Sequence, residues 1–271
     1  MTRKAVILAG GRGSRMQDSD GEQVELDSEA RRLADKGLKG LIPVDGRPFM
    51  DYLVDSLVDA GIQNLCLVIS PGCRELQNYV QQTNSRTSAQ VEWTVQEEPR
   101  GTADALLTAG DFADDEPFIM CNCDNLYPSA TLRDLADITD RISYVVAFER
   151  EQLLERSNFG EDRVRNFAVI QSEGDRLANI VEKPQQPDEY RQNGKLWVNM
   201  NLYRFSPEIF DACGRIAPDP DRGELELTAA VLLLAREQEM RVRRSRGGVI
   251  DITGRRDVEQ ARRMINTQQT G

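Results

Sequence analysis

Residues 4–16 read KAVILAGGRGSRM, a short apolar run followed at once by a glycine-rich turn. The apolar run predicts a buried strand over residues 4–9. Glycines let the backbone turn sharply and approach a ligand closely, and successive N–H groups in such a loop surround phosphate oxygens. The loop contains three glycines and two arginines, Gly10, Gly11, Gly13, Arg12 and Arg15. The pattern indicates a loop that binds nucleotide phosphate; the alternative is an ordinary tight connection after a strand.

The loop differs from the two most familiar glycine-rich phosphate loops. A P-loop requires Gly-Lys-Ser or Gly-Lys-Thr after four intervening residues, and none follows here. A dinucleotide fingerprint requires a third glycine where this chain has Met16. The sequence therefore favours a phosphate loop of another kind.

The composition restricts the chemistry. The net charge is −11 and the pI is about 4.8, which argues against a broad nucleic-acid surface. The 271 residues include no histidine, which excludes Ser–His and Cys–His nucleophile pairs. Carboxylates, Lys, Arg, backbone dipoles and a hard metal ion remain, and this set suits phosphoryl or nucleotidyl transfer.

The cysteine count and the hydropathy pattern indicate the cellular compartment in which the protein works. Five cysteines without framework spacing predict a reduced, cytoplasmic protein. Cys121 and Cys123 would share one face of a strand, which favours packing over a zinc pair. No apolar stretch is long enough to span a membrane, and we expect no signal peptide because the sequence enters a strand directly. The sequence leaves open whether the protein forms a homo-oligomer.

Strands and helices alternate in the first half of the chain. This pattern predicts an α/β fold with a doubly wound, mostly parallel Rossmann-like sheet. Ligands bind such sheets at the carboxyl ends of the strands, where the glycine loop, Gln96 and Asp124 all lie. The expected strands are 4–9, 65–69, 91–96 and 117–123, and the expected helices are 48–61, 73–82 and 101–112.

The second half is richer in strands, which are expected at 143–149, 164–170, 176–182, 197–205 and 247–251. Helices are expected at 225–236 and 254–265. We predict one domain over residues 1–271, with a first half to about residue 140 and a second half from about 141. The polar segment 17–36 is predicted to be a surface-loop insertion with a helical turn at 28–35.

Several further segments resemble motifs of one enzyme family, and they follow in the family's order. They are the loop with Gly11, Gly13, Ser14 and Arg15; Lys39 with Pro43; Gln96 to Gly101-Thr102; Cys123-Asp124-Asn125; Glu182-Lys183-Pro184; Asn199 to Tyr203; and Asp251-Ile-Thr-Gly. Over about residues 4–265 the chain thus resembles the sugar-1-phosphate nucleotidylyltransferases, or nucleoside-diphosphate-sugar pyrophosphorylases. Their fold is the glycosyltransferase-A-like variant of the doubly wound sheet. The resemblance implies that about residues 1–140 form a nucleotide-binding half and about 141–271 a sugar-phosphate-binding half.

The resemblance implies that an oxygen of a sugar 1-phosphate attacks the α-phosphorus of an NTP and releases pyrophosphate. It implies catalytic roles for Arg15, Lys39 and Lys183, and Mg²⁺ bound by Asp124 and Asp251. The implied nucleotide-binding residues are Leu8, Ala9, Gly10, Gly11, Gly13, Ser14, Gln96, Gly101 and Thr102. The implied sugar-phosphate-binding residues are Asn125, Glu182, Lys183, Asn199 and Tyr203.

Several residues also have structural interpretations. Asp124 could cap the turn before Pro128, and Asp251 could begin the last helix as a cap. Asp104 falls in the first turn of a helix, where a carboxylate is favourable anyway, and it receives no chemical role. Cys123 replaces a common family glycine, which leaves the placement of base or ribose open. The insertion is long enough to cover the triphosphate, but an inert loop is preferred.

The motifs leave the acceptor and the base open. A nucleotidyltransferase with a non-sugar acceptor and a catalytically silent homologue that binds nucleotide sugars are the alternatives. The Gly101-Thr-Ala-Asp-Ala segment resembles adenylyl- and guanylyltransferases, whereas Asp124-Asn125 and the absence of a C-terminal repeat domain resemble thymidylyl- and uridylyltransferases. The sugar is not specified.

Overall fold

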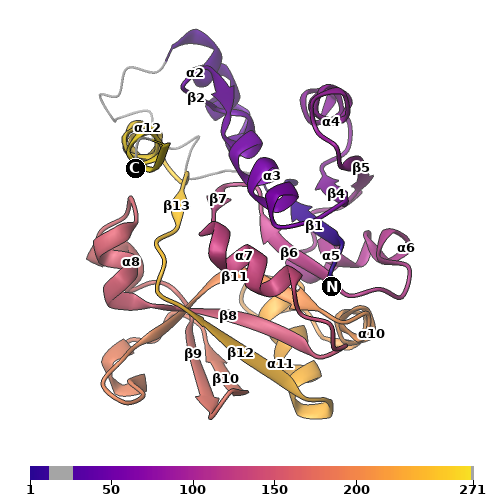
Figure 1. Cartoon of the computed structure of the whole chain (residues 1–271). Coiled ribbons are helices and arrows are strands. Elements are labelled where there is room, and N and C mark those ends of the chain that lie inside the picture. Colours follow the sequence, from indigo (N-terminus) through magenta and orange to yellow (C-terminus); the bar gives the residue numbers. More distant parts are fainter. Residues whose placement is uncertain (12–26, 270–271) are drawn as a thin grey trace.

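The computed structural model describes residues 1–11 and 27–269 (Figure 1). Within these residues, a nine-stranded sheet has the order β5-β4-β1-β6-β11-β8-β12-β10-β9. Its strands are β1 (Lys4–Leu8), β4 (Asn64–Ile69), β5 (Gln90–Val95), β6 (Phe118–Asn122), β8 (Ser143–Glu149), β9 (Val169–Glu173), β10 (Arg176–Val181), β11 (Trp197–Phe205) and β12 (Met240–Ser245). Strands β10 and β11 run opposite to the rest. The predicted α/β fold with a mostly parallel sheet is confirmed.

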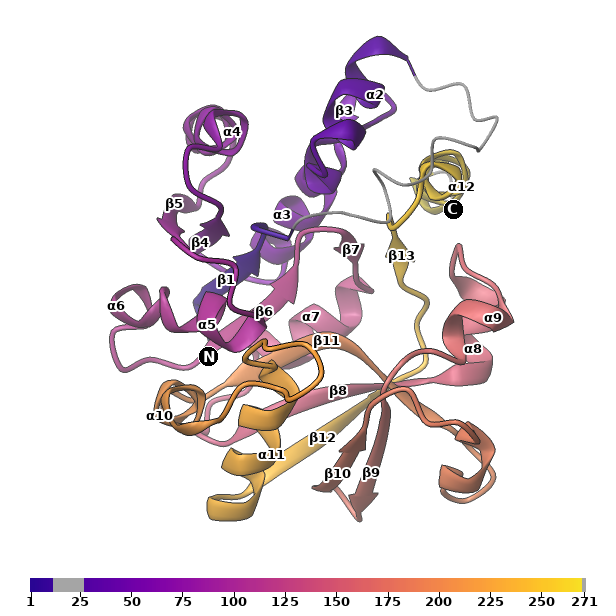
Figure 2. The ribbon, with the colours of Figure 1, turned by 180° about the vertical axis from the view of Figure 1, so that it is seen from behind.

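Helices cover both faces of the sheet, because successive strand residues point to opposite sides. Ile7 packs into one apolar core and Val6 into the other. The first core includes α2 (Ser28–Asp35), α3 (Phe49–Asp59), α4 (Arg74–Arg86), α7 (Ser129–Ala136), α8 (Arg150–Arg156), α9 (Glu161–Val164) and α12 (Arg255–Gln269). The second includes α5 (Thr102–Leu107), α6 (Gly110–Ala113), α10 (Glu208–Arg215) and α11 (Leu227–Glu237), which are best seen from behind (Figure 2).

Short elements lie between the long strands and helices, and β2, β7 and β13 among them are labelled in Figure 1. They are the 3₁₀ turns η2 (Lys39–Leu41) and η3 (Pro187–Tyr190) and the strands β2 (Pro43–Val44), β3 (Arg47–Pro48), β7 (Asn125–Leu126) and β13 (Ile250–Asp251). Strands β7 and β13 form a separate antiparallel pair in which Asp251 faces Asn125. This pairing joins the end of the first half of the chain to the end of the second.

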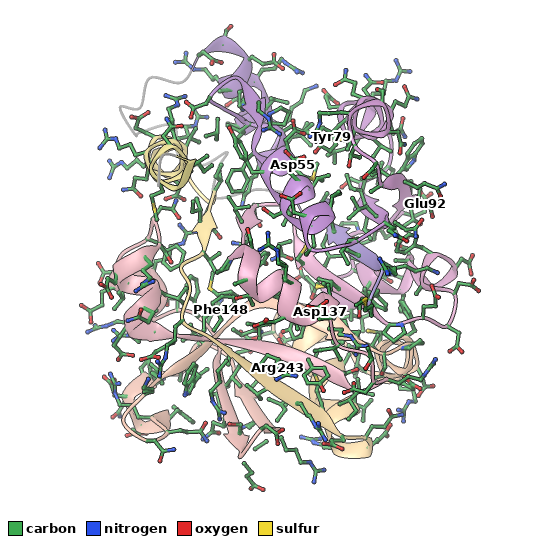
Figure 3. All side chains as sticks on the ribbon, in the orientation of Figure 1. Asp55, Tyr79, Glu92, Asp137, Phe148 and Arg243 are labelled. Atoms are coloured by element: carbon green, nitrogen blue, oxygen red, sulfur yellow. The ribbon has the colours of Figure 1, made fainter. Side chains whose placement is uncertain are left out.

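Polar contacts join α3 to α4 on one face of the sheet. Arg86 on α4 donates to Asp55 at 2.6 Å, and the hydroxyl of Tyr79 donates to Asp51 at 2.9 Å (Asp55 and Tyr79 are labelled in Figure 3). Asp51 and Tyr79 are both buried, so their hydrogen bond satisfies groups that water does not reach. The two helices are thereby held together beside β4 and β5.

The helical turn expected at 28–35 within the segment 17–36 is confirmed, and it is a helix that packs on the core. Residues 28–35 form α2, and Ala30, Leu33 and Ala34 on it are buried. Asp27 caps the helix by accepting from the backbone N–H of Ala30 at 2.7 Å, which satisfies one of the unpaired donors of the first turn. Residues 17–26 lie outside the described residues.

Other boundaries also differ from the predictions. The expected strand 164–170 is replaced by α9 and by β9, which begins at Val169; Gly160 and an acidic first turn favour the helical turn. The expected helix 101–112 breaks into α5 and α6, because the hydroxyl of Thr108 bonds back to Ala105 at the break. In the expected strand 247–251 only β13 forms, and α7, α8, α10 and β12 were not predicted.

Candidate active site

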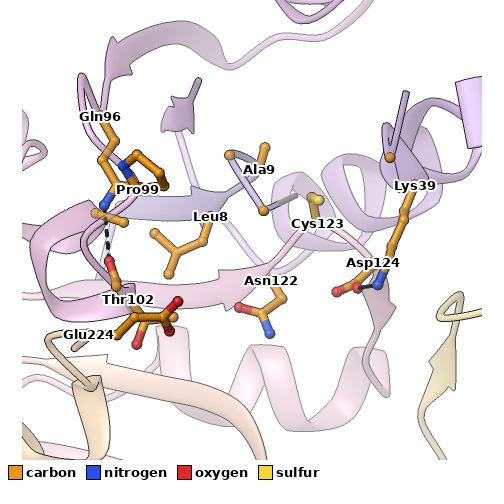
Figure 4. Close-up of a pocket in the computed structure, with 15 residues that line it drawn as sticks. Leu8, Ala9, Lys39, Gln96, Pro99, Thr102, Asn122, Cys123, Asp124 and Glu224 are labelled. Carbon is orange, nitrogen blue, oxygen red and sulfur yellow. Dashed lines mark hydrogen bonds and ion pairs between the residues drawn. The ribbon is translucent and has the colours of Figure 1, made fainter. Parts of the chain in front are cut away.

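A cavity of about 400 Å³ opens at the carboxyl ends of β1, β5 and β6 (Figure 4). Doubly wound sheets bind ligands at this position. The cavity brings together every predicted nucleotide-binding residue that the structure describes, together with two residues predicted to be catalytic or metal-binding. These residues are Leu8, Ala9, Gly10, Gly11, Gln96, Gly101, Thr102, Lys39 and Asp124. Gly13, Ser14 and Arg15 lie outside the described residues, and all of these roles stay predictions.

The first part of the glycine loop is attached to the neighbouring strand β4. The hydroxyl of Ser70 donates to the carbonyl of Gly10 at 2.9 Å, and Ala9 N–H donates to Val68 at 2.9 Å. A Cβ on Gly10 would lie 3.3 Å from the backbone carbon of Ile69. A side chain at this position would therefore press on β4, which explains the glycine.

Gly101 lies on the wall of the cavity opposite the glycine loop, and the structure leaves no room there for a side chain. Its φ is +119°, and a Cβ there would lie 2.5 Å from the carbonyl oxygen of Leu225. Leu225 bonds on both sides of this glycine, donating to Arg100 at 2.7 Å and accepting from Ala103 at 2.9 Å. The segment around Gly101 is thus fixed to the loop before α11.

Lys39 and Asp124 meet between this cavity and the next one. The ammonium of Lys39 donates to Oδ2 of Asp124 at 3.0 Å, and both side chains are mostly buried. The approach depends on Gly40, where a Cβ would lie 3.1 Å from the carbonyl oxygen of Cys123. Burial raises the pKa of the Cys123 thiol to about 12, so this cysteine lines the cavity as a neutral group.

Asp251 lies on β13 close to Asp124. The N–H of Ile252 donates to the carbonyl of Asp124 at 2.9 Å, and the amide of Asn125 donates to Oδ2 of Asp251 at 2.8 Å. Burial and the nearby carboxylate of Asp124 raise the pKa of Asp251, while the guanidinium of Arg163 opposes the increase. The two carboxylates are therefore close enough to interact, and each also pairs with a cation, Asp124 with Lys39 and Asp251 with Arg163.

A second cavity, of about 520 Å³, lies beyond this pair of carboxylates. Its lining includes Asn125, Lys183 and Asn199 of the predicted sugar-phosphate set, as well as Asp124 and Asp251. Lys183 is exposed, and its φ of +41° is unusual for a residue with a side chain. The backbone there turns sharply after β10 and brings the lysine to the cavity.

Glu182 and Tyr203 occupy different positions from their predicted neighbours. Glu182 lines a third, adjoining cavity of about 200 Å³ and accepts from the hydroxyl of Thr228 on α11 at 2.7 Å. Tyr203 has no exposed surface, and its hydroxyl accepts from the amide of Asn199 at 2.5 Å. The structure thus places Tyr203 beneath Asn199, where it orients that side chain, and not at the cavity wall.

Two residues at the site were missed from the sequence. Asn122, the last residue of β6, lines all three cavities, and its place just before the Cys-Asp-Asn motif was the available signal. Arg163 at the end of α9 forms ion pairs with Asp251 and Asp257. No motif of the sequence includes Arg163, and the short helix α9 on which it lies was not predicted.

The geometry of the site agrees with a family-level similarity. Residues 4–252 match the model of a protein family described as nucleotidyl transferase. The chain belongs to the nucleotidyl transferase family. The match confirms the resemblance inferred from the motifs at the level of this family, and it covers both halves of the chain.

Two named relatives are each 29% identical to this chain. This nucleotidyl transferase is 29% identical to the UTP–glucose-1-phosphate uridylyltransferase AglF of Haloferax volcanii, over 86% of this chain and 84% of that one. It is also 29% identical to the low-salt glycan biosynthesis nucleotidyltransferase Agl11 of the same organism, over 84% of this chain. It spans only 56% of the length of Agl11.

A solved structure supports the fold. A UDP-glucose pyrophosphorylase complexed with UDP-glucose aligns with a TM-score of 0.74 over 99% of this chain and 100% of that one, at 20% identity. Among the described residues of this nucleotidyl transferase, no helix is both long enough and apolar enough to cross a membrane.

Proposed function

We propose that this nucleotidyl transferase transfers a nucleoside monophosphate from an NTP to a sugar 1-phosphate, and so makes an NDP-sugar for nucleotide-sugar biosynthesis. The observation that carries the proposal is the joining of the cavities. The nucleotide cavity and the second cavity share Asn122 and Asp124, so two anionic substrates can meet end to end beside Lys39.

The transfer needs no covalent enzyme intermediate. An oxygen of the sugar phosphate forms a bond to the α-phosphorus, and the bond from that phosphorus to the bridging oxygen breaks as pyrophosphate leaves. Lys39 is close enough to the shared wall to stabilise charge on the triphosphate. Lys183 lines the second cavity, where it would neutralise the incoming sugar phosphate. Arg15 is proposed to hold the leaving pyrophosphate together with the glycine loop.

Asp124 and Asp251 fit a magnesium ion in part of its coordination shell. Among the residues the structure describes, no group of three metal-ligating side chains is close enough to hold an ion alone. Mg²⁺ is commonly bound by one or two carboxylates, with phosphates and water completing its shell. The carboxylate of Asp124 helps to raise the pKa of its neighbour Asp251, and two carboxylates this close together suit such a cation. The bound ion would supply polarisation of the α-phosphate.

The second cavity also contains groups that suit a sugar. Asn199 and Asn201 line it and the third cavity, and Glu182 lines the third. Amide and carboxylate groups are the hydrogen-bonding partners that sugar hydroxyls require. These residues support a sugar phosphate over an acceptor that lacks hydroxyls.

We infer a cytoplasmic location. All five cysteines are free thiols, and three of them are buried where they serve as packing residues. Free thiols of this kind are typical of a reducing compartment.

The test is a matrix of five triphosphates (UTP, dTTP, GTP, ATP and CTP) against several sugar 1-phosphates, with pyrophosphate release and NDP-sugar formation both measured. At least one pair should turn over only when Mg²⁺ is present. No turnover with any pair, while nucleotide sugars still bind, would mean that the chain is a silent binding homologue.

A matched pair of variants locates the chemistry. Asp124→Asn keeps the volume but removes the charge, and should lower kcat by about a hundredfold or more with little change in melting temperature. Asp134→Asn removes a carboxylate on the exposed face of α7 and should leave kcat unchanged. Equal activity of the two variants would contradict the role of Asp124.

A further inference from the structure

A fourth cavity, of about 760 Å³, opens beside the ends of β9 and β12 and the start of β11. None of the described residues that line it lines any of the three cavities at the proposed active site. Its lining contains no carboxylate among the described residues, but it contains three cations, Lys195, Arg244 and Arg246. The whole chain has a net charge of −11, so this wall is a positive region in an acidic protein.

Arg244 is held in place by neutral groups. Its Nη2 donates to the hydroxyl of Ser172 and to the carbonyl of Gly174, both at 2.8 Å, and its guanidinium lies 5.4 Å from the ring centre of Trp197. No carboxylate of the described residues pairs with it, and the N–H groups on Nε and Nη1 have no partner there. The guanidinium therefore keeps its charge and three fixed donors for an anion.

The other two cations share one carboxylate. Lys195 and Arg246 pair with the same oxygen of Glu149, at 2.9 and 3.0 Å. Glu149 is 8% exposed and lies behind these two side chains, outside the lining of the cavity. One carboxylate among three cations leaves an excess of positive charge.

The loop that carries Lys195 is closed and attached to the sheet. The N–H of Gln192 donates to the carbonyl of Lys195 at 2.8 Å, and the N–H of Lys195 donates back at 3.0 Å. Asn193 and Gly194 between them both have positive φ, as in a type I′ turn. The amide of Gln192 donates to the backbone of Ser172 on β9 at 2.8 Å. The position of the ammonium is thus fixed in advance, which lowers the entropy lost on binding.

We propose that the fourth cavity binds an organic phosphate, with Arg244 as the cation that anchors the phosphate group. A phosphate monoester presents several acceptor oxygens, and guanidinium and ammonium groups are the donors that match them. The volume exceeds that of the nucleotide cavity, about 400 Å³, and leaves room for the organic part of the ligand. The inference is independent of the proposed function, because none of these residues is assigned to the transfer reaction.

The chain contains a fluorescent probe for the test. It has two tryptophans, and Trp197 lines the cavity, whereas Trp93 lies on β5 at one edge of the sheet. Trp93→Phe therefore leaves a single tryptophan that reports on this cavity. Glucose 6-phosphate and glycerol 3-phosphate are titrated at constant ionic strength, and at least one should change the fluorescence saturably. Glucose and glycerol, which lack the phosphate, should have no effect.

Two neighbouring arginines provide a variant and its control in this background. Arg244→Met keeps the length of the side chain but removes its charge, and should weaken binding at least about tenfold. Arg243 is the next residue along β12, so its side chain points to the other face, where it lies 5.3 Å from the ring centre of Tyr144. Arg243→Met should bind as tightly as the parent protein. Equal weakening by the two substitutions would show a general effect of charge and would overturn the inference.

Glu149→Gln gives a test of opposite sign. It removes the carboxylate that occupies Lys195 and Arg246, and should tighten binding about threefold. Structural damage would not tighten binding, so this variant keeps the inference testable if Arg244→Met does not fold. Unchanged or weaker binding by a folded Glu149→Gln would contradict the charge balance described for the cavity.

Further outcomes separate this cavity from the active site. A response that is lost in Lys183→Met but kept in Arg244→Met would place the phosphate in the second cavity and overturn the inference. The absence of a saturable response to either ester, or an equal response to sulfate, would overturn it as well. Pyrophosphate release from NTP and sugar 1-phosphate is a separate measurement, and its absence would overturn the proposed function alone.

Discussion

The ammonium of Lys39 lies 3.0 Å from Oδ2 of Asp124, although 85 positions separate the two residues in the chain. Lys39 begins the turn η2, and Asp124 follows β6. Gly40 makes the approach feasible by packing directly on Cys123. The pair thus places a cation and a carboxylate together at the boundary between the two large cavities.

Replacing Lys39 should separate catalysis from folding. Lys39→Met keeps the length of the side chain but removes its charge, and should lower kcat/KM about a hundred- to a thousandfold, because charge on the triphosphate loses its partner. Steady-state kinetics of pyrophosphate release measures the loss. Lys36→Met, which removes an exposed lysine three residues away that pairs with Glu75, is the control and should remain near wild type. Similar kinetics for the two variants would contradict the catalytic role of Lys39.

Two glycine-to-alanine substitutions should have opposite effects on stability. Gly101→Ala forces a residue with a Cβ to φ +119° and against the backbone of Leu225, at a cost of about 2–4 kcal/mol. Gly214→Ala lies in helix α10 with nothing near the added atom, and it should raise the free energy of unfolding by about 0.5–1 kcal/mol. Thermal unfolding measures both. A Gly101→Ala protein as stable as wild type would show that the loop before α11 does not press on this position.

Burial should protect most thiols from modification. It raises the pKa of Cys66, Cys123 and Cys213 to about 12, and it also raises that of Cys121. The reactive thiolate of these four residues is therefore scarce at pH 8. A disulfide reagent at pH 8 should modify about one thiol in the native protein, the half-buried Cys73, and all five in denaturant. Cys73→Ser should abolish the native reaction; rapid labelling of Cys123 would contradict the raised pKa of its thiol.

The sequence predicted those parts of the fold that have a strong local pattern. Strands 143–149 and 197–205 were predicted to the residue, because apolar runs bounded by polar turns carry their own boundaries. Strand β12 was missed because its buried residues are separated by arginines, as in Arg243 and Arg244, and it becomes a strand by pairing with β8 and β10. Tertiary contact decided that element and local propensity did not.

The site shows the same division. Motif order was enough to select Lys39, Asp124 and Gln96, and the structure brings all three to one cavity. Asp104 was set aside as a favourable first-turn carboxylate, because its contact with Gln96 depends on how the loop folds over eight residues. Tyr203 was expected at the sugar, but the register shift in β11 between Asn199 and Tyr203 leaves it in the core.

The attachment of α2 to α4 should depend on pH through Glu75. Its carboxylate accepts from Lys36 and Arg32 of the α2 region, and the hydrogen bond from Lys36 is the main reason that its pKa falls from 4.5 to about 2. A lowered folded-state pKa means that the stabilisation is fully present above about pH 4.5 and is lost as the pH falls toward 2. The melting temperature of Glu75→Gln should therefore lie below that of wild type at pH 6, and the gap should close between pH 5 and pH 2. The corresponding difference in the free energy of unfolding should be small, at most about 1 kcal/mol, because the pair is partly exposed and screened by salt. Glu155→Gln, which removes a carboxylate that accepts from an amide, should show no such gap. A gap for Glu75→Gln that widens as the pH falls would mean that α2 is held to α4 by something other than this carboxylate.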